Sequence, residues 1–231
     1  MLEFTARKHC PTWDLQITAL EPTIPECASQ NPSHGWNTVK LDWWVKAVLD
    51  APDGTELLLI DADTVILQPL DELWTMPFEL MYTVRDLGLP FNGGVVGIRV
   101  SPAVRAFMLA WQAENARMVT DRVHHEYWRR LYGGINQASF GRLLARYDPC
   151  PCEVCAARGD GLPELPNVGM LALPCNEWNL VRWDAFRSLH VRILHIKSRL
   201  RRAVFAPEGP PPSMAHLSAV WHTIEQEMLQ S

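Results

Sequence analysis

The sequence lacks three things: a long apolar run, net positive charge and a secretion-like N-terminus. No apolar stretch approaches the roughly 20 residues that a membrane-spanning helix needs, so no membrane span is predicted. The formal net charge is −5, which excludes a nucleic-acid binder that works through bulk charge. The first residues show no basic segment followed by an apolar core, so they do not resemble a signal peptide. We therefore expect a cytoplasmic protein.

The chain also lacks internal repeats and any composition shift that would mark a second domain. Its 231 residues suit one large globular domain. Strand-like and helix-like segments alternate along it, which predicts an α/β fold with a mainly parallel mixed central sheet flanked by helices. We expect this domain to cover residues 1–206, and residues 207–231 to form a linker and a C-terminal helix that packs on the same domain.

Local patterns predict the individual elements. Residues 57–60 form a short apolar run after a turn, which is typical of a central strand buried on both faces. Three prolines and no periodicity predict a loop over residues 21–35, and the helix after it is expected to begin at Asn37 or Thr38. The other expected helices are 2–9, 102–116, 136–147 and 217–229, and the other expected strands are 14–20, 65–67, 81–84, 91–100, 170–173 and 191–195.

Two carboxylates, Asp61 and Asp63, follow the predicted strand at 57–60 directly. Ligands of open α/β sheets bind at the carboxyl ends of strands. Carboxylates that meet there repel each other, and a hard divalent cation such as Mg²⁺ or Mn²⁺ removes the repulsion. The alternative is an aspartate pair that caps a turn, and the spacing alone does not decide between the two.

Residues 58–67 (LLIDADTVIL) are similar to the D-x-D segment of GT-A fold nucleotide-diphospho-sugar glycosyltransferases, of the retaining glycogenin and bacterial galactosyltransferase type. Three further segments match in the family's order. Residues 91–96 (FNGGVV) resemble its FNAGVM strand, residues 136–140 (NQASF) its DQ motif, and residues 193–198 (ILHIKS) its late I-x-H-x-x-G-x-x-K motif. The resemblance implies metal-dependent transfer of a sugar, with retention, from a nucleotide-sugar donor, expected to be a UDP-sugar, to an unknown acceptor.

The resemblance also implies residue roles. Asp61, Asp63 and His195 would hold Mn²⁺ or Mg²⁺ against the donor diphosphate, although a lone histidine at a strand end is usually structural. With the two aspartates, Gln137 is the expected catalytic residue, because its carbonyl oxygen can stabilise positive charge on the sugar. The expected donor-binding residues are Lys40, Ala62, Asn92, Gly93, Gly94, Asn136, Lys197 and Arg199. Among these, Lys40 can equally be an exposed helix charge, the two glycines can mark a β-bulge, and Asn136 replaces the family's usual aspartate.

Two further features have weaker assignments. Trp178 and Asn179 are expected acceptor contacts, because a tryptophan face covers the apolar face of a sugar well, but most of the ten tryptophans must lie in the core. Cys150, Cys152 and Cys155 lie in an inserted cysteine-rich loop at 149–166. With Cys175 they would complete a structural Zn²⁺ site, and reduced free thiols are the alternative.

Compared with the family, the chain starts inside the first helix and lacks the first strand, whose end forms part of the nucleotide base pocket. A truncated chain, a pocket rebuilt from another element and a degenerate transferase all remain open. The competing function is therefore a non-catalytic sugar-nucleotide or glycan-binding module. A metal-dependent phosphotransferase or nucleotidyltransferase is disfavoured, since no glycine-rich phosphate loop is found as a clear motif.

Overall fold

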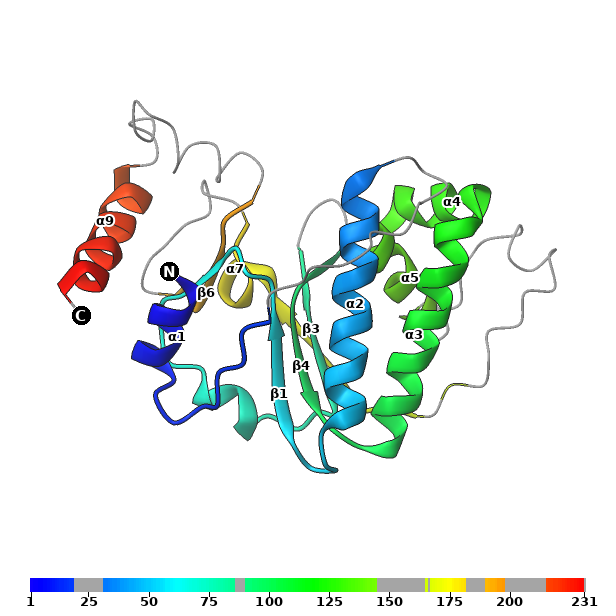
Figure 1. The fold of residues 1–231 in the computed structure, drawn as a ribbon, viewed down its shortest axis with the longest axis horizontal. Coiled ribbons are helices and arrows are strands. Elements are labelled where there is room, and N and C mark those ends of the chain that lie inside the picture. Colours follow the sequence, from blue (N-terminus) through cyan, green and yellow to red (C-terminus); the bar gives the residue numbers. More distant parts are fainter. Residues whose placement is uncertain are drawn as a thin grey trace.

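The structure is a computed structural model that describes residues 1–18, 31–85, 90–144, 165, 167–181, 190–197 and 215–230. These residues form an α/β fold (Figure 1). In chain order the elements are α1 (Leu2–His9), α2 (Pro32–Asp50), β1 (Glu56–Ile60), β2 (Thr64–Ile66), the 3-10 helix η1 (Asp71–Thr75), β3 (Leu80–Val84), β4 (Phe91–Arg99), α3 (Pro102–Thr120), α4 (Arg122–Tyr132), α5 (Ile135–Leu144), β5 (Met170–Pro174), α7 (Cys175–Trp178), β6 (Ile193–His195) and α9 (Ala215–Gln230).

The main sheet is mixed, with the strand order β1-β4-β3-β5. Strand β4 pairs antiparallel with both β1 and β3, and only the β3–β5 pair is parallel. The expectation of a mainly parallel sheet is therefore wrong. The physical reason is local: β3 ends at Val84 and β4 begins at Phe91, and a connection this short cannot make the crossover of about a dozen residues that a parallel pair needs.

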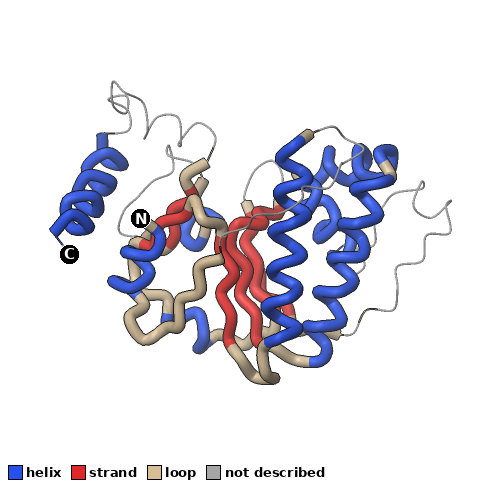
Figure 2. Tube along the Cα trace, viewed as in Figure 1, coloured by secondary structure: helices blue, strands red, loops and turns tan. Residues whose placement is uncertain are grey.

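Successive strand side chains point to opposite faces of the sheet, and an apolar cluster covers each face. On one face Leu80 and Ile98 pack with α2, α3 and α5. On the other face Met81 and Val95 pack with α1, η1 and α7. Figures 1 and 2 show α2 and α3 lying over the sheet, with α1 and α7 on its other side. The sheet therefore has a helical layer on one face and a layer of shorter elements on the other, each packed through an apolar cluster.

A second, two-stranded sheet pairs β2 with β6 antiparallel. Ile224 of α9 is buried in a cluster with Val65 of β2 and Leu194 of β6. The Lys8 ammonium of α1 lies 2.6 Å from the Glu227 carboxylate of α9. Contacts from α1 and α9 therefore support the small sheet that carries His195.

Several element predictions need correction. Strand β1 lies at one edge of the main sheet and its side chains are only half-buried, so it is not a central buried strand, although they contact the apolar clusters on both faces. Residues 14–18 form no strand, and residues 19 and 20 of that predicted strand lie outside the described residues. Helix α2 begins at Pro32, because the Asn31 side chain accepts a hydrogen bond from Ser33 N and caps it.

Helix α4 escaped prediction, although the Asp121 side chain caps it by accepting from His124 N at 2.9 Å. It brings a buried charged network into the helical layer. The Glu114 carboxylate lies 2.9 Å from Arg142 Nη1 and 2.6 Å from His124 Nε2. Buried charges need such partners, so this network joins α3, α4 and α5. No helix in the described part of the chain is both long and apolar enough to cross a membrane.

His125 of α4 gives a pH prediction. Its ring is fully buried against His34 of α2, and neither ring nitrogen has a hydrogen-bond partner among the described residues. Burial, followed by the neighbouring His34 and Arg129, lowers the pKa of His125 to about 4, although Glu126 opposes this. His124 lowers the pKa of His125 further. Protonation of this ring is therefore disfavoured in the folded chain.

Because the unfolded chain binds this proton more readily, stability falls as the pH drops from 6.5 towards 4. Between pH 7 and pH 5 we expect His125 to reduce the free energy of unfolding by about 2 kcal/mol. Urea unfolding at both pH values checks this against His125→Phe, which keeps a buried ring. Carboxylates titrate alike in both proteins, so the variant should lose less stability than the wild type. Equal losses would contradict the prediction.

Candidate functional site

Asp61, Asp63 and His195 lie together at the end of β1, as expected of metal ligands. One ligand atom of each lies within 4.8 Å of the others, and this is the sole such group of three found in the described segments. His195 Nε2 is 3.0 Å from Asp63 Oδ1 and 3.5 Å from Asp61 Oδ2. Two carboxylate oxygens and one imidazole nitrogen form a donor set that suits a divalent cation.

The backbone explains how residues so far apart in the chain meet. Asp61 N donates to Gly94 O at 2.9 Å, which extends the β1–β4 pairing by one residue. The chain then turns, since Thr64 N and Oγ1 both donate to Asp61 O. Thr64 pairs with His195 across the small sheet, and Ile196 N donates to Asp63 O at 2.7 Å. The turn and the β2–β6 ladder therefore hold both carboxylates beside the imidazole.

Asn179 sets the orientation of His195. Its Oδ1 lies 3.0 Å from His195 Nδ1, while its Nδ2 donates to Thr83 Oγ1 at 2.8 Å and to Asn92 O at 3.3 Å. Because these two acceptors fix the amide nitrogen, Asn179 Oδ1 must accept from His195 Nδ1. The other ring nitrogen, Nε2, then faces the two carboxylates and hydrogen-bonds to Asp63, and a metal ion bound there would replace that hydrogen bond.

Ionisation in this trio follows the same geometry. His195 is 1% exposed, and burial lowers its pKa despite the opposing carboxylates. Burial alone would raise the pKa of Asp63, but the hydrogen bond from His195 and the charge of Lys197 hold it below its usual value. A neutral imidazole beside an ionised carboxylate is the protonation state that binds a metal.

Gly94 leaves the space that the His195 ring occupies. A Cβ atom at residue 94 would overlap Cε1 and Nδ1 of the His195 ring. The β3–β4 register shifts here, because Tyr82 pairs with Val96 while Thr83 pairs with Asn92. This shift agrees with the β-bulge that the glycines can mark, and the imidazole lies directly against the bare backbone of Gly94.

Two lysines, Lys40 and Lys197, lie beside the two carboxylates, and Arg85 adds positive charge near Lys197. Lys40 Nζ of α2 lies 2.7 Å from Asp61 Oδ1 and 3.2 Å from Gly93 O. Lys197 Nζ lies 3.1 Å from Asn92 Oδ1. Burial, followed by the charge of Arg85, lowers the pKa of Lys197 to about 8. Sequence reasoning did not select Arg85, which has no motif around it, and Arg199 lies outside the described residues.

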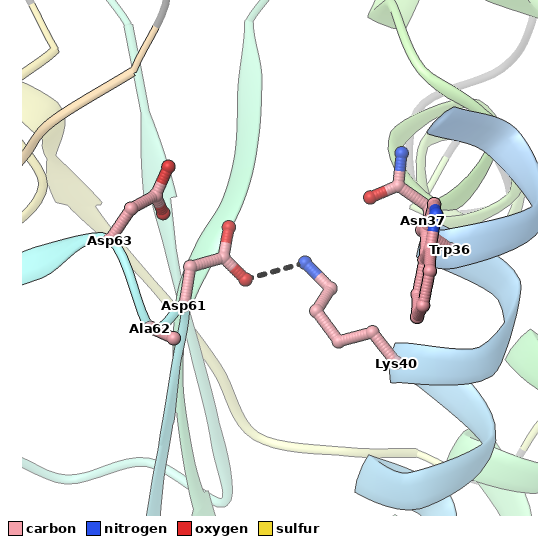
Figure 3. Close-up of a pocket in the computed structure, with 6 residues that line it drawn as sticks. All are labelled: Trp36, Asn37, Lys40, Asp61, Ala62 and Asp63. Atoms are coloured by element: carbon pink, nitrogen blue, oxygen red, sulfur yellow. Dashed lines mark hydrogen bonds and ion pairs between the residues drawn. The ribbon is translucent and has the colours of Figure 1, made fainter. Parts of the chain in front are cut away.

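A pocket of about 460 Å³ lies between α2 and the Asp61–Asp63 turn. Figure 3 shows Lys40 reaching across it from α2 to Asp61. The sequence analysis selected four of its lining residues, but Trp36 and Asn37 were not predicted to take part. The sequence holds a signal for Trp36, because it is four residues before Lys40. That spacing puts both side chains on one helix face only if the helix begins before residue 36, as α2 does. The lining residues are Trp36, Asn37, Lys40, Asp61, Ala62 and Asp63.

Gln137 lies beside the glycine bulge. Its Nε2 donates to Phe91 O at 2.9 Å and to Tyr132 O at 2.7 Å, and its Cγ is 3.6 Å from where a Gly93 Cβ would be. The amide nitrogen is therefore committed to the protein. Its carbonyl oxygen, which the expected role requires, has no hydrogen-bond partner in the described parts of the chain.

Two asparagines of the expected donor site face inward instead. Asn136 is buried, and its Nδ2 donates to Asn37 O at 2.7 Å, so it supports α2 behind the pocket wall. Asn92 is also buried and reaches the site through Lys197. Both are thus placed to position pocket residues.

The expected acceptor contacts are not placed to meet an acceptor. Trp178 is 2% exposed and packs under the Arg192 guanidinium, so neither face of its ring is open to a sugar. Asn179 is buried and binds His195. Cys175 of α7 is a buried free thiol, and burial raises its pKa. The other cysteines of the expected zinc site, Cys150, Cys152 and Cys155, lie outside the described residues with the loop at 149–166.

The site therefore joins a three-ligand group for a divalent cation to two lysines and an open pocket. A divalent ion would add to this positive charge, so the arrangement suits an anionic, phosphate-like ligand. The mixed α/β sheet and the Asp-Asp-His group are compatible with the resemblance to GT-A fold glycosyltransferases. Searches against protein-family models and curated proteins find no match for this chain.

Proposed function

We propose that this protein is a metal-dependent glycosyltransferase with a GT-A-like layered fold. It moves a sugar from a nucleotide-diphosphate donor, expected to be a UDP-sugar, to an acceptor. The observation that carries the proposal is the convergence of Asp61, Asp63 and His195, with Nε2 facing both carboxylates. The four motifs in the family's order support it.

The donor set fits the implied metal. Carboxylates suit both Mg²⁺ and Mn²⁺, while the imidazole favours the softer Mn²⁺. Asp61, Asp63 and His195 would hold the ion, which supplies Lewis-acid stabilisation of the charge that develops on a leaving diphosphate. The charge balance supports the same ligand class, because a divalent ion with Lys40 and Lys197 outweighs the two carboxylates by two charges.

The chain's own residues take the remaining roles. Lys40 and Lys197 direct ammonium groups to the site and stabilise negative charge on the leaving group. Gln137 offers its carbonyl oxygen beside the glycine bulge to the positive charge that builds up on the transferred sugar. Because an amide is a poor nucleophile, retention through a front-face route fits this residue better than a covalent intermediate does.

The decisive experiment measures nucleoside diphosphate release from a panel of UDP- and GDP-sugars with Mn²⁺ and with a chelator. We expect release from at least one donor, lost on chelation and in Asp63→Asn. Asp50→Asn is the matched control, because Asp50 is exposed at the end of α2 and its one ion pair within the described residues is with Lys46. Binding without release would favour the sugar-nucleotide-binding module, and no binding of any donor would refute both functions.

A further inference from the structure

Trp36 is an exposed side chain and the one aromatic residue among the described residues that line the pocket. It is 47% exposed and lines the pocket with Asn37 and Lys40. Trp36 and Lys40 are four residues apart on α2, so they share one helix face (Figure 3). An indole left in water costs free energy, and its presence in a pocket points to an apolar ring surface that covers it.

The position of Trp36 relative to the charged groups limits which ligands could place a ring against the indole. Lys40 Nζ lies at Asp61, so the charged part of a ligand belongs at that end of the pocket. The backbone of Trp36 lies one helical turn away, about 5–6 Å along α2, so a ligand whose charged part meets Lys40 can extend along the same helix face towards the indole.

The turn of α2 that carries Trp36 is held in place. Asn136 Nδ2 donates to Asn37 O at 2.7 Å, and Asn115 Nδ2 donates to Thr38 Oγ1 at 3.0 Å. These buried amides come from α5 and α3 and fix the residues next to Trp36. A rigid aromatic surface loses little entropy when it binds a ring.

We propose that Trp36 is the stacking platform for a ring of the phosphate-bearing ligand, either its nucleobase or the apolar face of its sugar. This rests on the proposed function for the identity of the ligand. The shared chemistry is a flat ring joined to a phosphate, and the two sources are separated by comparing ligands that have and lack the sugar.

The test uses the full-length protein and isothermal titration calorimetry with Mn²⁺ and four probes: UDP-glucose, UDP, GDP-mannose and GDP. Trp36→Ala should weaken the best-bound probe by about 5- to 20-fold, and Trp36→Phe should restore most of the loss. Trp43→Ala is the matched control. Trp43 is on the same helix and 42% exposed, but it does not line the pocket.

The probes separate the two rings. Equal losses for the sugar nucleotide and its nucleoside diphosphate would assign the platform to the base, and a loss for the sugar nucleotide alone would assign it to the sugar. Two results would overturn the platform while leaving the proposed function intact. In one, Trp36→Ala binds the probes as tightly as the wild type does; in the other, Trp43→Ala weakens binding as much as Trp36→Ala. Failure of the wild type to bind any probe would instead overturn the proposed function, and the platform with it.

Discussion

Replacing Gly94 with alanine should weaken Mn²⁺ binding by about 100-fold or more. The added methyl group would occupy space that the Cε1 and Nδ1 atoms of His195 fill. The ring cannot yield easily, because it is 1% exposed and hydrogen-bonded to Asn179. It must therefore leave the two carboxylates or shift the β4 backbone, and either change separates the three ligands.

The neighbouring glycine provides a matched control. A Cβ atom on Gly93 would lie 3.4 Å from the Phe91 ring and 3.6 Å from Gln137, which is ordinary contact. Gly93→Ala should therefore retain Mn²⁺ affinity within a few-fold. Calorimetric titration with Mn²⁺ measures both variants, and circular dichroism shows whether each is folded. A folded Gly94→Ala protein that binds Mn²⁺ like the wild type would contradict this account of the site.

Much of the metal-binding group could be predicted from the sequence, because its ligands lie within short local patterns. Asp61 and Asp63 follow an apolar run, and β1 ends before them as predicted. His195 was selected only through its motif, yet β2–β6 pairing brings it to the aspartates. The role of Gly94 was predicted only as a bulge or a close approach to the donor, whereas its methyl-free backbone accommodates the His195 ring.

Other features depend on contacts that no local pattern encodes. Strand direction is one, because a short apolar run looks the same in a parallel and an antiparallel pair. The burial of Trp178 is another, since its cover by Arg192 comes from a residue beyond the reach of helical or strand periodicity. The platform at Trp36 was missed for a simpler reason. The prolines between residues 21 and 35 suggested a loop, but Pro32 is at the first helical turn, where its missing N–H costs nothing.

Replacing Asn179 with leucine should weaken Mn²⁺ binding by about 10- to 100-fold, although Asn179 touches no ligand position directly. Its Oδ1 is the acceptor that keeps a proton on His195 Nδ1 and leaves Nε2 as the ring nitrogen that can bind the metal. Leucine has a similar volume but no acceptor, so the buried ring would lose this partner and both tautomers would be populated. Asn179 is a positioning residue, and its effect should therefore appear in the imidazole itself.

The ¹⁵N chemical shifts of the His195 ring report that tautomer without any activity measurement. In the metal-free wild type they should show a protonated Nδ1, and in Asn179→Leu a mixture of the two tautomers. Asn179→Asp keeps an oxygen acceptor at the same place and should restore the Nδ1 tautomer. A purely structural role for Asn179 would lower thermal stability and leave these shifts unchanged. Loss of Mn²⁺ affinity without a tautomer change would therefore show that Asn179 supports the fold of the site and does not orient its histidine.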